Sequence, residues 1–66
     1  METEFWVEAD LAVKDRSKVI GYSVWHINQA GGREKVHDFT ATRKGGAMVA
    51  LHLANTMRDD LNSGVA

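Results

Sequence analysis

Two histidines are the residues of this 66-residue chain whose spacing is best suited to metal chemistry. His26 and His37 lie at equal distances on either side of Gly31-Gly32, so a hairpin that turns at the glycines brings the two rings face to face. Imidazole nitrogens are common metal ligands, but a stable site needs more than two of them. The third histidine, His52, falls on the predicted solvent side of a helix. We therefore expect hydrogen-bonded neutral rings, no metal site and no cofactor.

A short basic and glycine-rich segment just before the helical pattern is the candidate anion site. Its residues are Thr42, Arg43, Lys44, Gly45 and Gly46. Free backbone N–H groups at a helix N-terminus attract anions, glycines allow close approach, and the two cations add charge. Arg33 and Lys35 in the preceding hairpin extend the candidate to nucleic acid. The alternative is a solvated loop with a Thr or Gly cap, which we favour because the full phosphate-loop pattern is missing.

Nucleophilic catalysis finds little support in the sequence. The chain has no cysteine, and Ser17, Ser23 and Ser63 fall in a predicted turn, strand and tail. No spacing places a base and an orienting acid beside any of these hydroxyls. We therefore expect a protein without enzymatic activity.

Length, charge and hydropathy indicate the broad class of the protein. The chain has room for one domain, residues 1–66, and 44% of its residues are hydrophobic. Eight Lys and Arg against nine Asp and Glu give a formal charge of −1, a poor basis for wrapping nucleic acid. No apolar run approaches the roughly 18 residues of a membrane span, and the N-terminus is acidic where a signal peptide is basic. We expect a cytoplasmic protein without membrane contact.

Hydrophobic periodicity predicts three strands and one helix. Alternating apolar and β-branched residues predict strands near residues 4–14, 18–29 and 34–41. From about residue 44 to residue 62, apolar residues recur at three- and four-residue spacing, which predicts a helix whose buried stripe includes Leu53 and Met57. The predicted fold is α+β (β-β-β-α), a three-stranded antiparallel meander followed by one C-terminal helix packed on one sheet face.

Two hairpin turns determine which side chains share a face of the predicted sheet. A two-residue type I′ turn at Gly31-Gly32, with positive φ at both glycines, sets the second hairpin. A two-residue turn at Arg16-Ser17 sets the first. The helix-side face that follows is Phe5, Val7, Ala9, Leu11, Val13, Ile20, Tyr22, Val24, His26, His37, Phe39 and Ala41. A three-residue first turn is the alternative, and it places Trp25 on the helix side.

The opposite face carries an apolar group that one helix cannot cover. Its members are Trp6, Val19, Trp25, Ile27 and Val36. Such a patch exceeds what a small monomer usually exposes, so it predicts a protein–protein interface, most simply with a second copy of the chain. We therefore expect a homodimer, with another protein as the alternative partner and nucleic-acid binding as the alternative function. A register error, with Trp25 inside and Tyr22 outside, is the competing explanation.

The predicted layout is similar to that of two nucleic-acid-binding classes. Three-stranded sheets followed by a helix with a basic N-terminus occur in double-stranded RNA-binding domains and in the three-strand DNA-binding domains of some integrases. This chain has more acidic than basic residues and carries no diagnostic motif of either class. The resemblance concerns layout alone, and the salt dependence of binding distinguishes phosphate contacts from apolar self-association.

Overall fold

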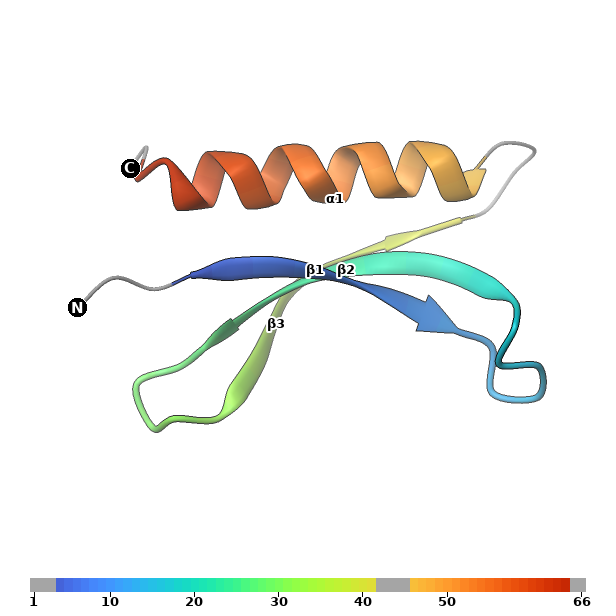
Figure 1. Ribbon diagram of the computed structural model, residues 1–66, viewed down its shortest axis with the longest axis horizontal. Helices are drawn as coiled ribbons and strands as arrows, with labels where there is room; N and C mark the ends of the chain where they lie inside the picture. Colours follow the sequence, from blue (N-terminus) through green and yellow to red (C-terminus); the bar gives the residue numbers. More distant parts are fainter. Residues whose placement is uncertain (1–3, 42–45, 65–66) are drawn as a thin grey trace.

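The computed structural model describes residues 4–41 and 46–64 of the chain. It contains three strands and one helix: β1 (Phe5–Leu11), β2 (Val19–Ile27), β3 (Arg33–Thr40) and α1 (Gly46–Asn62). The strands form one antiparallel sheet in the order β1-β2-β3, and α1 lies across one of its faces (Figure 1). The predicted β-β-β-α fold is confirmed. Within the described ranges, no helix is long and apolar enough to cross a bilayer.

The hydrophobic core lies between β2 and α1 and is built from small side chains. Val24 is fully buried, and Ala50 and Ala54 on α1 are 2% and 0% exposed. Positions i and i+4 share one helix face, so the two alanines let the helix backbone approach the sheet closely. The expectation that Leu53 belongs to the buried stripe is wrong. Its side chain projects to the flank of that stripe and remains 45% exposed.

The connection between β1 and β2 is longer than the predicted two-residue turn. The Asp15 carboxylate accepts hydrogen bonds from the N–H and the hydroxyl of Ser17, which stabilises a local turn of the kind that Asp favours. The predicted pairing of the two strands is therefore wrong by two residues, and Val7 lies opposite Val24. A shift of two residues leaves these side chains on their predicted face. Val13, however, lies outside the sheet and is 93% exposed.

The β2–β3 hairpin turns through a three-residue loop rather than a two-residue turn at Gly31-Gly32. Asn28 organises this loop, because its side-chain Oδ1 accepts hydrogen bonds from the N–H groups of Ala30 and Gly32. Gly31 has a positive φ of 88°, whereas Gly32 does not. A type I turn followed by one left-handed residue is a common three-residue hairpin loop, and glycine adopts that conformation without strain. The prediction of positive φ at both glycines is wrong.

A one-residue irregularity in β3 then compensates for the longer loop. Val24 lies opposite His37, but its neighbour Trp25 lies opposite Lys35, so Val36 is an extra residue in β3. Such a β-bulge changes the face on which the preceding residues of the bulged strand lie. Beyond the bulge, β3 keeps its predicted faces. Before the bulge, Arg33 and Lys35 lie on the side of the sheet away from α1. The predicted two-residue turn would have placed both on the helix side.

Candidate binding surface

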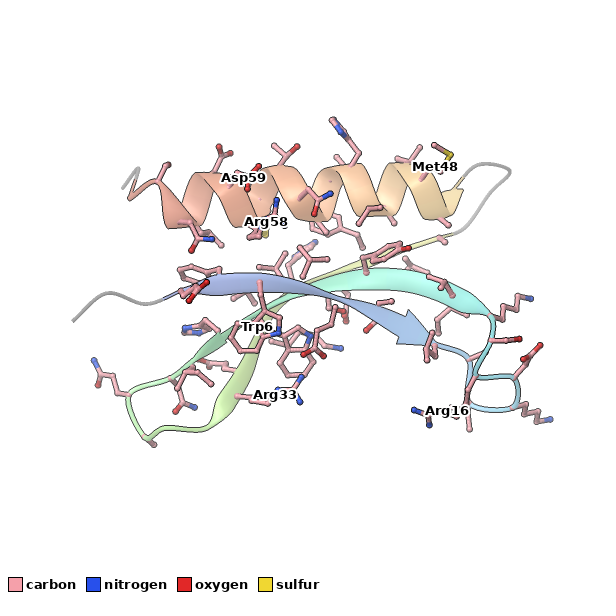
Figure 2. All side chains as sticks on the ribbon, in the orientation of Figure 1. Trp6, Arg16, Arg33, Met48, Arg58 and Asp59 are labelled. Carbon is pink, nitrogen blue, oxygen red and sulfur yellow. The ribbon has the colours of Figure 1, made fainter. Side chains whose placement is uncertain are left out.

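The sheet face that α1 leaves open, called the outer face below, carries aromatic and charged side chains. Its main members are Trp6, Glu8, Asp10, Ser23, Trp25, Ile27, Arg33, Lys35 and Asp38. Opposite residues of antiparallel strands share a face, so the strand pairing places these side chains together. Figure 2 shows Trp6 and Arg33 on the side of the sheet opposite to α1. All three strands therefore contribute to one surface.

Trp25 lies beneath two cations at one end of the outer face. The Arg33 guanidinium carbon is 4.5 Å from the centroid of the indole, and the Lys35 ammonium is 5.4 Å from it. Cations over an indole are attracted to the ring by about 0.5–1 kcal/mol at exposed sites. The indole N–H of Trp25 is buried and has no hydrogen-bond partner among the described residues. An unpaired buried donor costs free energy. Arg33 and Lys35 thus cover the ring of Trp25 but leave its N–H without a hydrogen bond.

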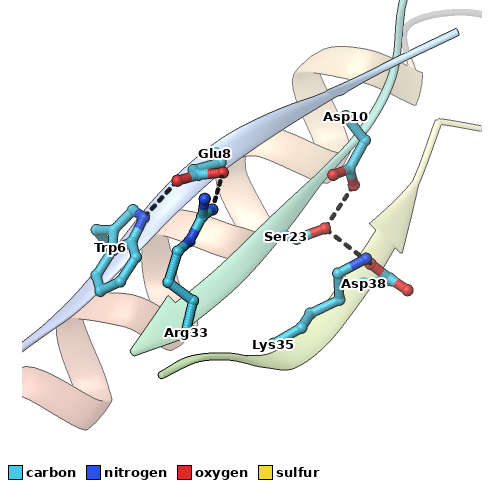
Figure 3. Close-up of polar contacts among 7 residues, drawn as sticks. All are labelled: Trp6, Glu8, Asp10, Ser23, Arg33, Lys35 and Asp38. Atoms are coloured by element: carbon cyan, nitrogen blue, oxygen red, sulfur yellow. Dashed lines mark hydrogen bonds and ion pairs between the residues drawn. The ribbon is translucent and has the colours of Figure 1, made fainter. Parts of the chain in front are cut away.

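Glu8 connects the second tryptophan to Arg33. The Trp6 indole N–H donates to one Glu8 carboxylate oxygen at 2.8 Å, and Arg33 Nη2 donates to the other at 2.7 Å (Figure 3). The hydrogen bond from Trp6, together with the charge and hydrogen bond of Arg33, holds the pKa of Glu8 below its usual value. The ion pair is partly exposed and contributes little to folding stability. Its effect is to hold Arg33 in position over Trp25.

Ser23 lies between two carboxylates farther along the outer face. It is fully buried, and its hydroxyl is within hydrogen-bonding distance of Asp10 and Asp38 (Figure 3). A hydroxyl has one proton, so it donates to one carboxylate at a time. Lys35 forms an ion pair with Asp38 at 2.9 Å. The hydrogen bond from Lys35 and then the bond from Ser23 lower the pKa of Asp38, and Asp38 in turn raises the pKa of Lys35.

A shallow, open pocket adjoins this acidic end of the outer face. Its lining residues are Asp10, Ile20, Gly21, Lys35, Asp38 and Thr40. Gly21 has no room for a side chain, because a Cβ there would lie 2.5 Å from the Phe39 carbonyl oxygen. A strand glycine of this kind marks a close approach of two backbones. With two carboxylates and one ammonium in its lining, the pocket suits a cationic group better than a phosphate.

The predicted interface residues are unevenly distributed over the sheet. Trp6, Trp25 and Ile27 lie on the outer face, where both tryptophans are half-buried and Ile27 is 46% exposed. Val36 is the extra residue of the β3 bulge and is also exposed. Val19 lies beyond another register irregularity, at the start of β2. Three of the five residues thus share one surface, and the interface itself stays a prediction.

The predicted anion site falls largely outside the described residues. Those not described are Thr42, Arg43, Lys44 and Gly45. Gly46 begins α1, and a Cβ there would come within 3.3 Å of backbone atoms of Ala41, so close packing accounts for this glycine. Arg33 and Lys35 lie on the outer face, each in an ion pair with a carboxylate. These two cations therefore take part in the surface around Trp25.

The two histidines do not lie opposite each other, contrary to the prediction. The three-residue loop and the bulge place His26 opposite Glu34, and its Nε2 lies 2.9 Å from a Glu34 carboxylate oxygen. The His26 ring stacks on Phe5, with 5.0 Å between the centroids. His37 packs against Phe39 at 4.5 Å. In the part of the chain that the structure describes, no three His, Cys, Asp or Glu side chains group as metal ligands.

Comparisons with known proteins add no relative on which a function could rest. No protein-family model, no curated protein and no solved structure matches the chain. The outer face is therefore the basis for assigning a function. Sequence reasoning identified Trp6 and Trp25, and it named Arg33 and Lys35 as candidate anion or nucleic-acid contacts, but it missed the position of these two cations above Trp25. No residue type marks the bulge that places the cations there.

Proposed function

We propose that this chain is a small, non-enzymatic protein–protein interaction module of the cytoplasm that self-associates through the outer face. The observation that carries the proposal is the Trp25 platform, an indole beneath Arg33 and Lys35 on the sheet face opposite to α1. Tryptophan and arginine are enriched among the residues that contribute most to binding at protein interfaces. Ile27, exposed on the same face, adds apolar surface beside the platform.

The Trp25 platform is ordered before any partner binds. Glu8 holds Arg33 through an ion pair, and Asp38 holds Lys35 in the same way. Side chains that already occupy one conformation lose less entropy on association.

The distribution of charge along the outer face supports pairing with a second copy. Arg33 and Lys35 lie toward the β2–β3 loop, whereas Glu8, Asp10 and Asp38 lie farther along the strands. A two-fold axis that runs across the strands would bring the basic end of one copy to the acidic end of the other. A dimer with two-fold symmetry uses the same patch on both subunits, so it requires a self-complementary face of this kind.

Sedimentation equilibrium at about 100 micromolar tests this proposal, since even a weak interface is populated at that concentration. We expect a dimer for the wild-type chain and a shift toward monomer for Ile27→Glu, which places a charge on the outer face. Val49→Glu is the matched control, because Val49 is an apolar residue of α1 that is 57% exposed. A monomeric wild-type chain, or a dimer that Val49→Glu disrupts and Ile27→Glu does not, would contradict the proposal.

Nucleic-acid binding is the alternative function, and the same purified wild-type chain can be tested for it. The outer face carries three carboxylates, Glu8, Asp10 and Asp38, against the cations Arg33 and Lys35. This balance is unfavourable for a phosphate backbone, which is why we rank self-association first. A monomer that binds single- or double-stranded nucleic acid, with affinity falling steeply as salt rises, would replace self-association by this alternative.

A further inference from the structure

Along its open edge, β1 has no neighbouring strand among the described residues. β2 is the central strand, so β1 and β3 are the edges of the sheet. The Phe5 N–H donates to Asn62 Oδ1 at 2.8 Å, and the Phe5 carbonyl accepts from Asn62 Nδ2 at 3.0 Å. The side-chain amide of Asn62 thus pairs with Phe5 as the backbone of a neighbouring strand would. The edge of β1 can therefore pair with an amide group, and at Phe5 the Asn62 side chain already provides one.

The next positions along this edge face the same way as Phe5. The N–H and C=O of a strand residue point to one side, and successive residues alternate between the two sides. Because the Phe5 groups point away from β2, those of Val7 and Ala9 do so as well. Within residues 4–41 and 46–64, neither Val7 nor Ala9 receives backbone hydrogen bonds of the kind that Asn62 gives to Phe5. Two consecutive outward positions therefore remain available for a strand.

The opposite edge, β3, is less suited to accepting a strand. It contains the bulge at Val36, and its first residues, Arg33 to Lys35, are all charged. Bulges and charged side chains both protect the edges of natural sheets against further pairing. In contrast, the pairing of β1 with β2 is continuous from Phe5 to Asp10. The structure thus favours β1 as the edge that extends.

The charge of β1 selects the chemistry of an added strand. Residues 4–13 contain Glu4, Glu8 and Asp10 and have no Lys or Arg. Directly opposed side chains of paired strands lie about 4.5–5.5 Å apart, so a basic residue opposite a carboxylate of β1 stabilises the pair and an acidic one destabilises it. A second β1 is a poor occupant, because two-fold pairing centred at Glu8 sets this carboxylate against its own copy.

We propose that the β1 edge binds an extended segment of another protein in which Lys or Arg alternates with apolar residues. The segment adds to the sheet as a fourth strand, with its backbone paired to Val7 and Ala9. Its basic side chains lie beside Glu8 and Asp10, and its apolar side chains lie on the helix side of the sheet. The site shares Glu8 and Asp10 with the outer face, but its backbone pairing uses the edge of the sheet, so it does not depend on self-association.

A synthetic capped peptide in which Lys alternates with Val is the probe for this site. At about 1 mM peptide, we expect the amide resonances of Val7 and Ala9 to shift and their hydrogen exchange to slow. Ala9→Pro should weaken binding about tenfold, because it removes an outward N–H that pairs with the peptide. An edge strand tolerates proline where the N–H faces away from its neighbour. Ala9→Val keeps the N–H and is the matched control.

Two further peptides keep the test decisive even if Ala9→Pro does not fold. One has the same charges but an N-methyl group on every backbone nitrogen, which removes the N–H donors from both of its edges, and the other has Glu in place of Lys. We expect neither to slow exchange at Val7 and Ala9. Equal binding of the N-methylated and unmodified peptides would reveal charge attraction without strand pairing and would overturn the proposal. So would unchanged exchange at Val7 and Ala9 with the Lys peptide. Asn62→Ala should extend the protection to Phe5.

Discussion

The two faces of the sheet exclude water by different means, although the same three strands form both. On the helix side, Val24 is buried beneath Ala50 and Ala54, where small side chains allow the helix to approach closely. On the outer face, the long side chains of Arg33 and Lys35 lie across Trp25. Their apolar stems cover the indole while their charges remain near water and carboxylates. Where α1 covers the sheet, small residues exclude water by close packing. On the outer face, long amphipathic side chains exclude water from the indole.

The largest effect that we predict breaks the close approach on the helix side. Ala54→Leu should lower the free energy of unfolding by about 1–3 kcal/mol, because a larger side chain at a fully buried position forces α1 away from the sheet. Thr56→Leu, an exposed position on the same helix, is the control and should change stability little. Urea denaturation followed by circular dichroism measures both. Equal stability of the two variants would show that the contact between α1 and β2 is loose.

A smaller loss is expected from the buried hydroxyl under the outer face. Ser23→Ala should lower the free energy of unfolding by about 1–2 kcal/mol, since a hydrogen bond to a carboxylate is lost in a fully buried position. Ser17→Ala removes a hydroxyl that bonds Asp15 in an exposed turn, where water replaces it. The same denaturation experiment compares the two variants. If Ser17→Ala costs as much as Ser23→Ala, burial does not strengthen the Ser23 bonds.

The charged network of the outer face makes stability depend on pH. The folded chain holds the pKa values of Glu8 and Asp38 below their usual range, so it binds these protons less readily than the unfolded chain. Their contribution is present above the ordinary carboxylate range and is lost as pH falls, from about pH 5 toward pH 2. Urea midpoints across this range should fall less steeply for the double variant Glu8→Gln, Asp38→Asn. Asp60→Asn on α1 is the control, and an identical slope in all three proteins would refute the network's role.

The smallest effect is expected at the flank of the helix. Leu53→Ala should change the free energy of unfolding by less than about 1 kcal/mol, because nearly half of this side chain is exposed. Leu53 is next in sequence to Ala54, so Leu53→Ala and Ala54→Leu together compare the flank of the helix with its buried stripe. Thermal or urea unfolding measures the stability of both variants. A loss of about 2–5 kcal/mol, typical of a buried leucine, would place Leu53 in the core.

Periodicity along the chain determined the type and order of the elements. Alternation along β1 and β2 and the three- and four-residue spacing after Gly46 are local patterns, and each element buries one side whatever lies next to it. The same alternation placed Trp6 and Trp25 on a common face, because a register shift of two residues leaves every side chain on its side. The β-β-β-α fold and the aromatic part of the outer face therefore followed from sequence alone.

Only the tertiary structure decided how the two hairpins close and what covers Trp25. The first connection depends on Asp15 binding Ser17, and the second on Asn28 binding two N–H groups of its loop. Each loop changed a register that composition could not specify, and the extra residue Val36 restored the faces in the second half of β3. A one-residue bulge moves side chains from one face to the other at small local cost. Alternative loop lengths and bulge positions differ little in local free energy. The packing of the whole sheet against α1 selects among them, and no short stretch of sequence encodes that packing.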